Sequence, residues 1–362
     1  MDALTQYLEQ HQERFLENLK ACLRIPSVSA QPAHKGDVRA CAEHVAAHLK
    51  SIGVPHAEVV DTAGHPVVYA EWLGAPGAPT ALLYGHYDVQ PPDPLDLWKT
   101  PPFEPTLRDG KLFARGACDD KGQVYMHLSA IEAHLKVNGK LPINLKIVIE
   151  GEEEVGSEHL ADFLKAWKDR LAADVILVSD TSMLGPDQPS LCYALRGLLY
   201  TEVEVTGPTR DLHSGEFGGA VMNPANALST IIHGLKDADG RITVPGFYDK
   251  VRELTDQQRT AMRELPFDEA GFIAESGAPM GVGEKGYSTI ERITSRPTLD
   301  VNGIWGGYTG AGAKTVLPSV APSTWVIQVP DESAGSPCVA PSGTWAARLC
   351  ELSCAVRSPG LR

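Results

Sequence analysis

The sequence has no segment that approaches the about 20 consecutive apolar residues that a membrane-spanning helix needs. Its first residues, MDALTQYLEQHQERFLENLK, contain neither the basic region nor the apolar core of a secretory signal. Basic residues are also scarce, since 32 Lys and Arg stand against 46 Asp and Glu and give a formal net charge of −14. Because phosphate groups bind basic surfaces, this charge argues against nucleic acids and anionic membranes as partners. We therefore expect a cytoplasmic protein that binds small solutes or metal cations.

Paired cysteine motifs are absent as well. The seven cysteines are an odd number without a CxxC pair, which favours free thiols in a reducing compartment over a disulfide framework. Three of them, Cys338, Cys350 and Cys354, lie near the end of the chain. Internal repeats and low-complexity segments are also lacking, and 43% hydrophobic with 22% charged residues is typical of a folded globular protein.

The length of 362 residues predicts two domains, since one domain usually takes about 150 residues. Short apolar runs rich in β-branched residues alternate with helical patterns, which predicts an α/β fold with a largely parallel sheet flanked by helices. The predicted strands, interpreted as buried on both faces, cover residues 67–72, 81–84, 143–149 and 175–178. The predicted helices cover residues 4–23, 38–52, 120–136 and 158–168.

The hydrophobic pattern changes near residue 195. From Leu195 to Val205, apolar and polar residues alternate as in a half-exposed antiparallel strand. We place a second, α+β domain after this point, with a helix over 223–235 and a glycine-rich stretch at 303–312. The predicted division is 1–194 for the first domain, 195–319 for the second, and 320–362 for a tail of atypical composition.

Three of the predicted strands end in histidine or acidic residues. His86 follows one strand, the glutamate-rich segment 150–154 follows another, and Asp180 follows a third. In a parallel sheet, ligands gather beyond the carboxyl ends of the strands. A further acidic pair, which begins with Asp119, precedes a predicted helix. The sequence therefore predicts a cluster of imidazole and carboxylate groups at one edge of the sheet.

Imidazole and carboxylate groups are ligands for borderline and hard divalent metals, and a carboxylate can bridge two such ions. We predict that His86 and Asp180 hold one ion and Glu154 another, with Asp119 between them. Carboxylates packed together at strand ends would repel one another unless a cation neutralised them.

Two more carboxylates have predicted roles beside these ligands. Asp88 can orient a ligand from outside the coordination shell. Glu153, next to a predicted ligand, can take a proton from water and later deliver it to a leaving group. Each signal alone has a structural explanation: a His-x-Asp pair in a loop, a solvated glutamate run, or acidic residues at a helix start. Their convergence at strand ends and one helix start favours the site.

The same residues carry a resemblance to a known family. Five motifs occur in family order: Leu-Tyr-Gly-His-Tyr-Asp-Val-Gln-Pro, Trp-Lys-Thr-Pro-Pro-Phe-Glu-Pro, Arg-Gly-Ala-Cys-Asp-Asp-Lys-Gly, Glu-Gly-Glu-Glu-Glu-Val-Gly-Ser and Val-Ser-Asp. They resemble the carnosinase-like dipeptidases, which belong to the dinuclear zinc peptidases together with aminoacylase, acetylornithine deacetylase and succinyl-diaminopimelate desuccinylase. The resemblance covers roughly residues 1–319.

This resemblance implies a two-zinc site in the first domain. It implies that His86 and Asp180 bind one zinc, Glu154 binds the other, and Asp119 bridges them, with Mn²⁺ or Co²⁺ as alternative metals. Asp88 would support His86, and the peptide bond after Asp119 would be cis. The same comparison makes Glu153 the general base.

In the second domain, the resemblance implies a lid that also forms a homodimer. The segment Asp-Leu-His-Ser-Gly-Glu-Phe-Gly-Gly is similar to the family's lid segment, whose histidine, here His213, reaches across the dimer to the substrate carbonyl bound by the partner. The segment that contains Thr315 resembles a second, substrate-contacting lid loop. From the residues alone, His213 is better explained as a surface histidine in a glycine-rich turn, and Thr315 is sufficiently explained as a turn residue.

Two features depart from the family pattern. The family supplies a further histidine ligand late in the chain, but this sequence has no histidine after His233, so we expect a weakened second metal site and reduced hydrolysis. Residues 320–362 contain no Lys, His, Asn, Phe, Tyr or Met. We expect an incomplete lid followed by a tail that is either out of frame or a divergent natural C-terminus.

The resulting functional hypothesis is a zinc-dependent dipeptidase that acts on short peptides. Two alternatives stay open. An N-acyl amino acid deacylase would use the same metal site, and a non-catalytic remnant would bind metal or dimerise without turnover.

Overall fold

The structure is a computed structural model that describes residues 2–185, 188–192 and 194–329. The chain divides into two compact units, Met1–Ser182 and Met183–Arg362. The division lies earlier than the predicted one at 194, within the irregular segment between the last strand of the first unit and the first strand of the second. The four cysteines in the described part of the chain are free, and Cys338, Cys350 and Cys354 lie outside it. None of the described helices combines the length and apolar character needed to cross a membrane.

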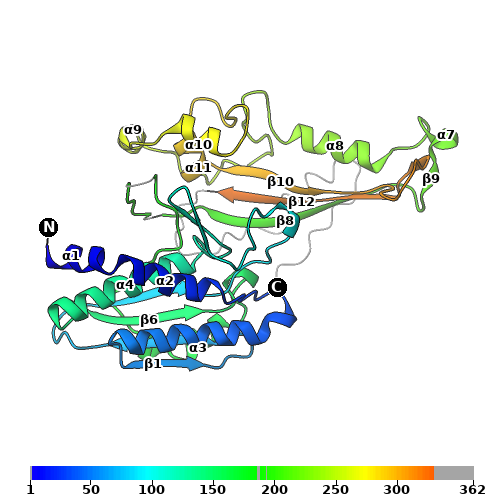
Figure 1. The fold of residues 1–362 in the computed structure, drawn as a ribbon. Coiled ribbons are helices and arrows are strands. Elements are labelled where there is room, and N and C mark those ends of the chain that lie inside the picture. The colour runs from blue at the N-terminus through cyan, green and yellow to red at the C-terminus, as the bar shows by residue number, and fades with distance from the viewer. Residues whose placement is uncertain (1, 186–187, 193, 330–362) are drawn as a thin grey trace. The chain divides into compact units, whose positions relative to one another are not determined.

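The first unit is built around a sheet with the strand order β1-β2-β6-β3-β7. Its strands are β1 (His56–Val60), β2 (Val67–Trp72), β3 (Thr80–His86), β6 (Asn144–Glu150) and β7 (Val175–Val178), with a small hairpin of β4 (Thr106–Arg108) and β5 (Lys111–Phe113). Its helices are α1 (Ala3–Gln10), α2 (Gln12–Leu23), α3 (Lys35–Ile52), α4 (Lys121–Asn138), α5 (Leu160–Ala166) and α6 (Lys168–Leu171), with the 3-10 turns η1 (Pro32–His34), η2 (Leu95–Leu97) and η3 (Glu153–Val155). The α/β class predicted from the alternating pattern is confirmed (Figure 1).

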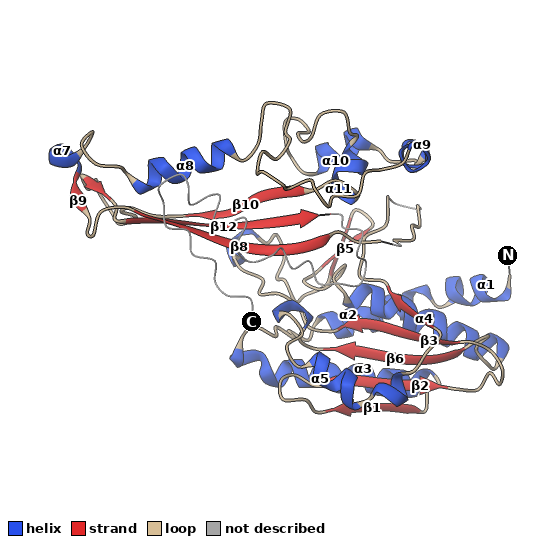
Figure 2. Cartoon of the chain, turned by 180° about the vertical axis from the view of Figure 1, so that it is seen from behind, coloured by secondary structure: helices blue, strands red, loops and turns tan. Residues whose placement is uncertain are grey.

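The two faces of the sheet are covered by different helices. Alternate residues of β2, such as Val68, pack with α3 and α4 in the largest core cluster. Their neighbours, such as Tyr69, point to the other face and pack with Phe163 and Leu171 from α5 and α6. This alternation is the consequence of the two-residue period of a strand. Figure 2 shows the sheet from behind, with α3 and α5 beside it.

Two predictions about this sheet need correction. The sheet is mixed rather than largely parallel, because β3 pairs in parallel with β6 and β7 whereas β2 runs antiparallel to β6 and β1. β7 was predicted to be buried on both faces, but its four side chains are exposed by 39–64%. The prediction of burial was wrong because β7 lies at an edge of the sheet, and apolar composition does not reveal whether other elements cover a strand.

The second unit contains a three-stranded antiparallel sheet with the order β10-β12-β8. Its strands are β8 (Gly197–Thr206), β9 (Leu212–His213), β10 (Thr298–Ile304), β11 (Val316–Leu317) and β12 (Val320–Val329). Its helices are α7 (Ser214–Phe217), α8 (Pro224–Gly234), α9 (Asp256–Glu264), α10 (Glu269–Glu275) and α11 (Thr289–Thr294). α8 packs on this sheet through Leu228 and Ile231, which share a core with Val203, Val205 and Trp325.

β12 extends the regular fold past Ser319, where the sequence analysis placed the start of the atypical tail. It is the central strand of its sheet, and its Ala321 and Trp325 are 1% and 3% exposed. The indole Nε1 of Trp325 donates to Ser323 Oγ, which in turn donates to the carbonyl oxygen of Gly303. Pro322 within a central strand is unusual, since proline cannot donate to the ladder, and this composition conceals the strand in the sequence. The rest of the predicted tail, 330–362, lies outside the described residues.

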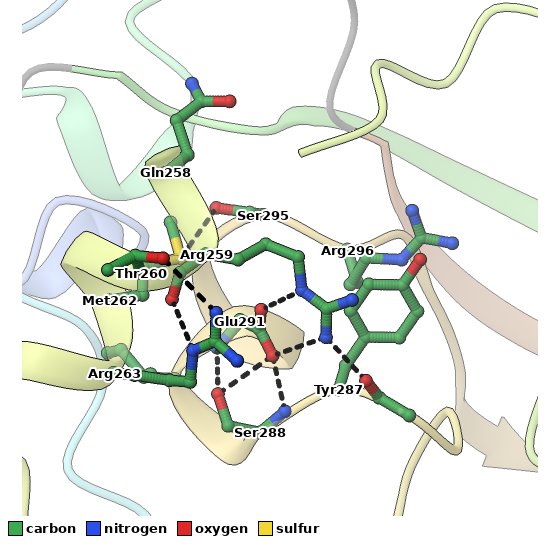
Figure 3. A network of polar contacts seen from close by, with 12 residues as sticks. Gln258, Arg259, Thr260, Met262, Arg263, Tyr287, Ser288, Glu291, Ser295 and Arg296 are labelled. Atoms are coloured by element: carbon green, nitrogen blue, oxygen red, sulfur yellow. Dashed lines mark hydrogen bonds and ion pairs between the residues drawn. The ribbon is translucent and has the colours of Figure 1, made fainter. Parts of the chain in front are cut away.

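An ionic network joins α9 and α11 of the second unit (Figure 3). Glu291 of α11 accepts from Arg259 of α9 at 2.7 Å and also from Ser288, whose hydroxyl caps α11. The guanidinium of Arg259 also donates to the carbonyl oxygen of Gly286. Close by, the fully buried guanidinium of Arg296 binds both carboxylate oxygens of Glu284. A buried charge is tolerated when it is paired and hydrogen-bonded in this way.

Candidate metal centre

The candidate centre lies where β3, β6 and β7 end. These three strands are parallel, so their carboxyl ends share one edge of the sheet. His86 is the last residue of β3 and pairs with Glu150, the last residue of β6. Asp180 follows β7, and Asp119 lies two residues before the start of α4. The predicted convergence of strand ends and one helix start is present in the fold.

Three of the predicted ligands come together there. His86 Nε2 lies 3.0 Å from Asp119 Oδ1 and 3.7 Å from Asp180 Oδ2. In the described residues, these three form the single group of His, Cys, Asp and Glu side chains whose ligand atoms all lie within 4.8 Å of one another. The imidazole is fully buried, whereas the side chains of Asp119 and Asp180 are 58% and 27% exposed. One neutral nitrogen and two carboxylates around a partly open space fit a divalent cation such as zinc.

Asp88 connects this histidine to the glutamate turn. It is fully buried, and its Oδ1 and backbone oxygen lie 3.3 and 3.1 Å from His86 Nδ1. A proton held on Nδ1 by this contact leaves Nε2 free to act as a ligand. The same carboxylate accepts from the backbone N–H groups of Glu153 at 3.2 Å and Glu154 at 3.1 Å. Asp88 therefore fixes both the imidazole and the start of η3.

Glu153 and Glu154 lie on η3 and are partly buried. The carboxylate of Glu154 accepts from Gln90 Nε2 at 2.8 Å and lies outside the triad of His86, Asp119 and Asp180. Burial raises the pKa of Glu154 above its ordinary value. Burial also raises the pKa of Glu153, and neighbouring carboxylates add to the rise although the charge of His86 opposes it.

Asp120 is a residue of the centre to which the sequence analysis assigned no role. It is 2% exposed, and its Oδ2 accepts from the backbone N–H of His86 at 3.2 Å. It stands at the N-cap position of α4 but makes no capping hydrogen bond, so the acidic pair is more than a helix start. The sequence signal for a role beyond capping is that two acidic residues, Asp119 and Asp120, stand together, whereas a helix cap needs only one. The peptide bond between Asp119 and Asp120 is cis, as the resemblance implied.

The electrostatics of the centre favour a bound cation. Asp120 Oδ1 is buried without a hydrogen-bond partner, and burial raises the pKa of Asp120 to about 7. Burial lowers the pKa of His86, but the hydrogen bond and charge of Asp88, with Asp120 and Asp180, raise it to about 10. Burial likewise raises the pKa of Asp180. A metal ion would reverse these shifts, because it stabilises ionised carboxylates and needs a neutral imidazole.

Lys121, the next residue of the same motif, holds the first turn of α4 in place through its side chain. Its side chain is 1% exposed, and Nζ donates to the carbonyl oxygens of Cys22 at 3.1 Å and Ile25 at 2.8 Å. These carbonyls lie at the C-terminal end of α2, where a positive charge is favourable. The start of α4 is thereby tied to α2.

The two predicted substrate residues lie in the second unit and contact each other. Val316 of β11 pairs with His213 of β9, and the preceding Thr315 has its Oγ1 3.1 Å from His213 Nε2. Gly215 N–H donates to His213 Nδ1 at 3.1 Å, which places the ring hydrogen on Nε2. The sequence motifs single out the two residues separately, and the strand pairing that joins them has no local sequence signal.

Comparison with known proteins agrees with this geometry. The sequence matches the peptidase family M20/M25/M40 over residues 82–358. The chain belongs to this family. The match continues beyond residue 319, where the sequence analysis ended the resemblance.

The relatives include metallodipeptidases. The chain is 35% identical over 331 residues to the Cys-Gly metallodipeptidase of Schizosaccharomyces pombe, an alignment that covers 88% of this chain and 70% of the relative. It is 32% identical over 332 residues to the human Beta-Ala-His dipeptidase, covering 88% and 66%. Homology of this extent makes the chain a metallopeptidase.

Solved structures extend the likeness to the fold. Human carnosine dipeptidase 1 superposes with a TM-score of 0.77 at 33% identity, covering 91% of this chain and 72% of that chain. An M20 family metallo-carboxypeptidase from Sulfolobus solfataricus gives a TM-score of 0.74 at 34% identity, covering 93% and 74%. These neighbours confirm the fold class and the dipeptidase-type resemblance that the five motifs indicated.

Proposed function

We propose that this peptidase hydrolyses dipeptides at the centre formed by His86, Asp119 and Asp180. The observation that carries the proposal is the joint position of a buried imidazole, its supporting Asp88 and two acidic ligands at one sheet edge. The dipeptidases among the relatives support the substrate class. The proposed setting is the cytoplasm, in accord with the free thiols of the described cysteines.

His86, Asp119 and Asp180 would hold one zinc ion, and Asp119 with Glu154 would hold a second. When bound, zinc polarises the scissile carbonyl and lowers the pKa of water. Manganese and cobalt accept the same nitrogen and oxygen ligands. We expect the second site to be the weaker one, because Glu154 lies outside the group of described residues whose ligand atoms converge.

Glu153 would move the proton. Its backbone is fixed by Asp88, and burial raises the pKa of its carboxyl, which favours holding a proton between two steps. The carboxylate accepts a proton from the attacking water. It then gives this proton to the amine nitrogen as the peptide bond breaks.

The second unit would act as lid and dimerisation element. His213 would donate from Nε2, which in this chain lies 3.1 Å from Thr315 Oγ1, to the oxyanion that develops on the substrate carbonyl. A groove of about 860 Å³ runs along α8 and includes the half-exposed side chains of Val221 and Met222. We propose that a second copy of the chain covers this surface.

The function is tested by assaying the metal-loaded protein with dipeptides, N-acetyl amino acids and longer peptides. The proposal is supported if the wild-type chain hydrolyses dipeptides and the Glu153→Gln variant, with its metal content retained, does not. Preference for N-acetyl amino acids identifies a deacylase, and preference for longer peptides a carboxypeptidase. Zinc binding without turnover of any of these substrates identifies a non-catalytic protein.

Dimerisation is tested by light scattering of the purified chain and of Met222→Glu. If the wild-type chain is a dimer and Met222→Glu is a monomer, the result supports the groove along α8 as the dimer interface. A monomeric wild-type chain contradicts it.

A further inference from the structure

The carboxylate of Glu152 precedes the two glutamates of the centre in sequence but makes its contacts elsewhere. Its side chain is 10% exposed. Oε1 accepts from the backbone N–H of His65 at 2.9 Å, and Oε2 accepts from the backbone N–H of His159 at 3.3 Å. The His159 ring Nδ1 lies 3.1 and 3.0 Å from the two oxygens. One side chain thus joins the loop before β2 to the segment after η3.

The backbone of Glu152 closes the turn that contains Glu153 and Glu154. Its carbonyl oxygen accepts from Val155 N–H at 3.1 Å and from Ser157 N–H at 2.8 Å. Because the side chain and the carbonyl belong to one residue, fixing the carboxylate also restricts the orientation of this turn.

The loop that receives the carboxylate is itself held in place. A Cβ atom on Gly64 would lie 1.7 Å from Glu152 Oε1, so this close approach requires glycine. His65 Nε2 lies 3.1 Å from the carbonyl oxygen of Ser29. The carbonyl oxygen of Pro66 accepts from the hydroxyl of Tyr87, the residue between His86 and Asp88. The anchor of Glu152 is therefore part of the framework around the centre.

We propose that Glu152 is a positioning residue that holds η3 so that Glu153 and Glu154 face the metal, as a second anchor besides Asp88. This inference rests on the proposed roles of Glu153 and Glu154. It goes beyond them because it assigns to Glu152 an effect on metal binding without contact with the metal. Replacing a direct hydrogen-bond partner of a metal ligand typically changes metal affinity 10–100-fold, which sets the upper scale of the effect expected for Glu152.

The test compares Glu152→Ala, Glu152→Gln and a matched control, Glu158→Gln, whose side chain is exposed on the same segment. Each purified full-length chain is titrated with Co²⁺, and the visible absorption spectrum reports both affinity and ligand geometry. We expect Glu152→Ala to bind the second Co²⁺ ion, the one held with Glu154, about 10–100-fold more weakly with an altered spectrum, and to lower kcat while KM changes little. Glu152→Gln, which can still accept from His65, is expected to lie between Glu152→Ala and wild type. The control is expected to match wild type.

A folded Glu152→Ala chain that binds Co²⁺ with wild-type affinity and spectrum overturns the proposal. If Glu152→Ala does not fold, Glu152→Gln decides: weaker binding supports the proposal and wild-type binding overturns it. If the wild-type chain binds Co²⁺ but hydrolyses no peptide, the proposed function fails, while the Co²⁺ readout still judges the role of Glu152.

Discussion

His86 Nε2 lies 3.0 Å from Asp119 Oδ1, although the two residues come from the end of a strand and the start of a helix. This contact brings together an imidazole nitrogen and a carboxylate, the pair on which the proposed metal site depends. We predict that His86→Ala lowers zinc affinity by at least about 100-fold, more than the loss of an orienting residue does. Isothermal titration calorimetry measures this. His233→Ala, which removes an exposed histidine, serves as the control and should bind zinc like the wild type.

Asp88 distributes its two oxygens between Glu153 and Glu154 while it also contacts His86. In Asp88→Asn, one oxygen becomes an amide that cannot accept, so one of these backbone N–H groups loses its partner. We predict a 10–100-fold weaker zinc affinity and a lower kcat, at unchanged secondary structure by circular dichroism. Asp96→Asn, on the exposed turn η2, is the matched control. Wild-type affinity in Asp88→Asn would refute the positioning role.

The metal-free protein should lose stability as the pH rises. Burial raises the pKa of Asp120 to about 7 from its ordinary 3.8, so the folded state holds a proton between these values that the unfolded chain has released. Burial lowers the pKa of His86, but its carboxylate neighbours raise it to about 10, and the stability it contributes is lost from about pH 6.5 to 10. Stability falls wherever the folded state binds more protons than the unfolded state.

Thermal unfolding with and without zinc measures this pH dependence. We expect the metal-free Tm to fall from pH 5 to pH 9, and the increase that zinc gives to be larger at pH 8 than at pH 5, because zinc requires the deprotonated ligands. Asp120→Asn removes one titrating group and should flatten the metal-free curve between pH 4 and 7. An equally steep curve in Asp120→Asn would show that other groups cause the dependence.

Trp325 tests whether the strand after Ser319 belongs to the fold. Its indole is 3% exposed in the core under α8, and it donates to the buried hydroxyl of Ser323. We predict that Trp325→Ala costs about 3–5 kcal/mol in the free energy of unfolding of the second unit. Trp305→Ala, at a tryptophan that is 49% exposed, should cost less than about 1 kcal/mol. Chemical denaturation followed by tryptophan fluorescence compares the two variants.

Much of the first unit could be predicted from its sequence, because hydrophobic runs define strands directly. Residues 67–72 and 175–178 were predicted as strands with the bounds that β2 and β7 have. The burial of β7 could not be predicted in this way, since an apolar strand has the same sequence pattern at the centre and at the edge of a sheet. Strand direction was also beyond the pattern, which is why the antiparallel pairing of β2 was missed.

The candidate site could be predicted in outline because its residues follow strand ends. The sequence could place His86, Asp119 and Asp180 at one edge of the sheet. It could not show that Asp120 turns its carboxylate to the His86 backbone or that Glu152 contacts His65, because these contacts depend on loop conformation. The pairing of β9 with β11, which joins His213 to Thr315, is likewise a long-range contact without a local signal.

Whether His213 acts on its own chain or across the dimer can be decided by mixing two inactive variants. His213→Ala removes the Nε2–H donor, and we predict a 10²–10³-fold lower kcat, the loss usual for one oxyanion donor. Glu153→Gln removes the proposed base.

In a dimer of one chain of each kind, the site with an intact Glu153 faces the intact His213 of the other chain only if the histidine reaches across. Equal amounts of the two variants, unfolded and refolded together, should then recover about a quarter of wild-type activity, because half of the dimers are mixed and each has one complete site. Recovery requires mixed dimers, so tagged chains are used to show that they have formed. Mixed dimers without activity would place His213 and Glu153 of the same chain in one site, since neither chain of the mixture then carries both.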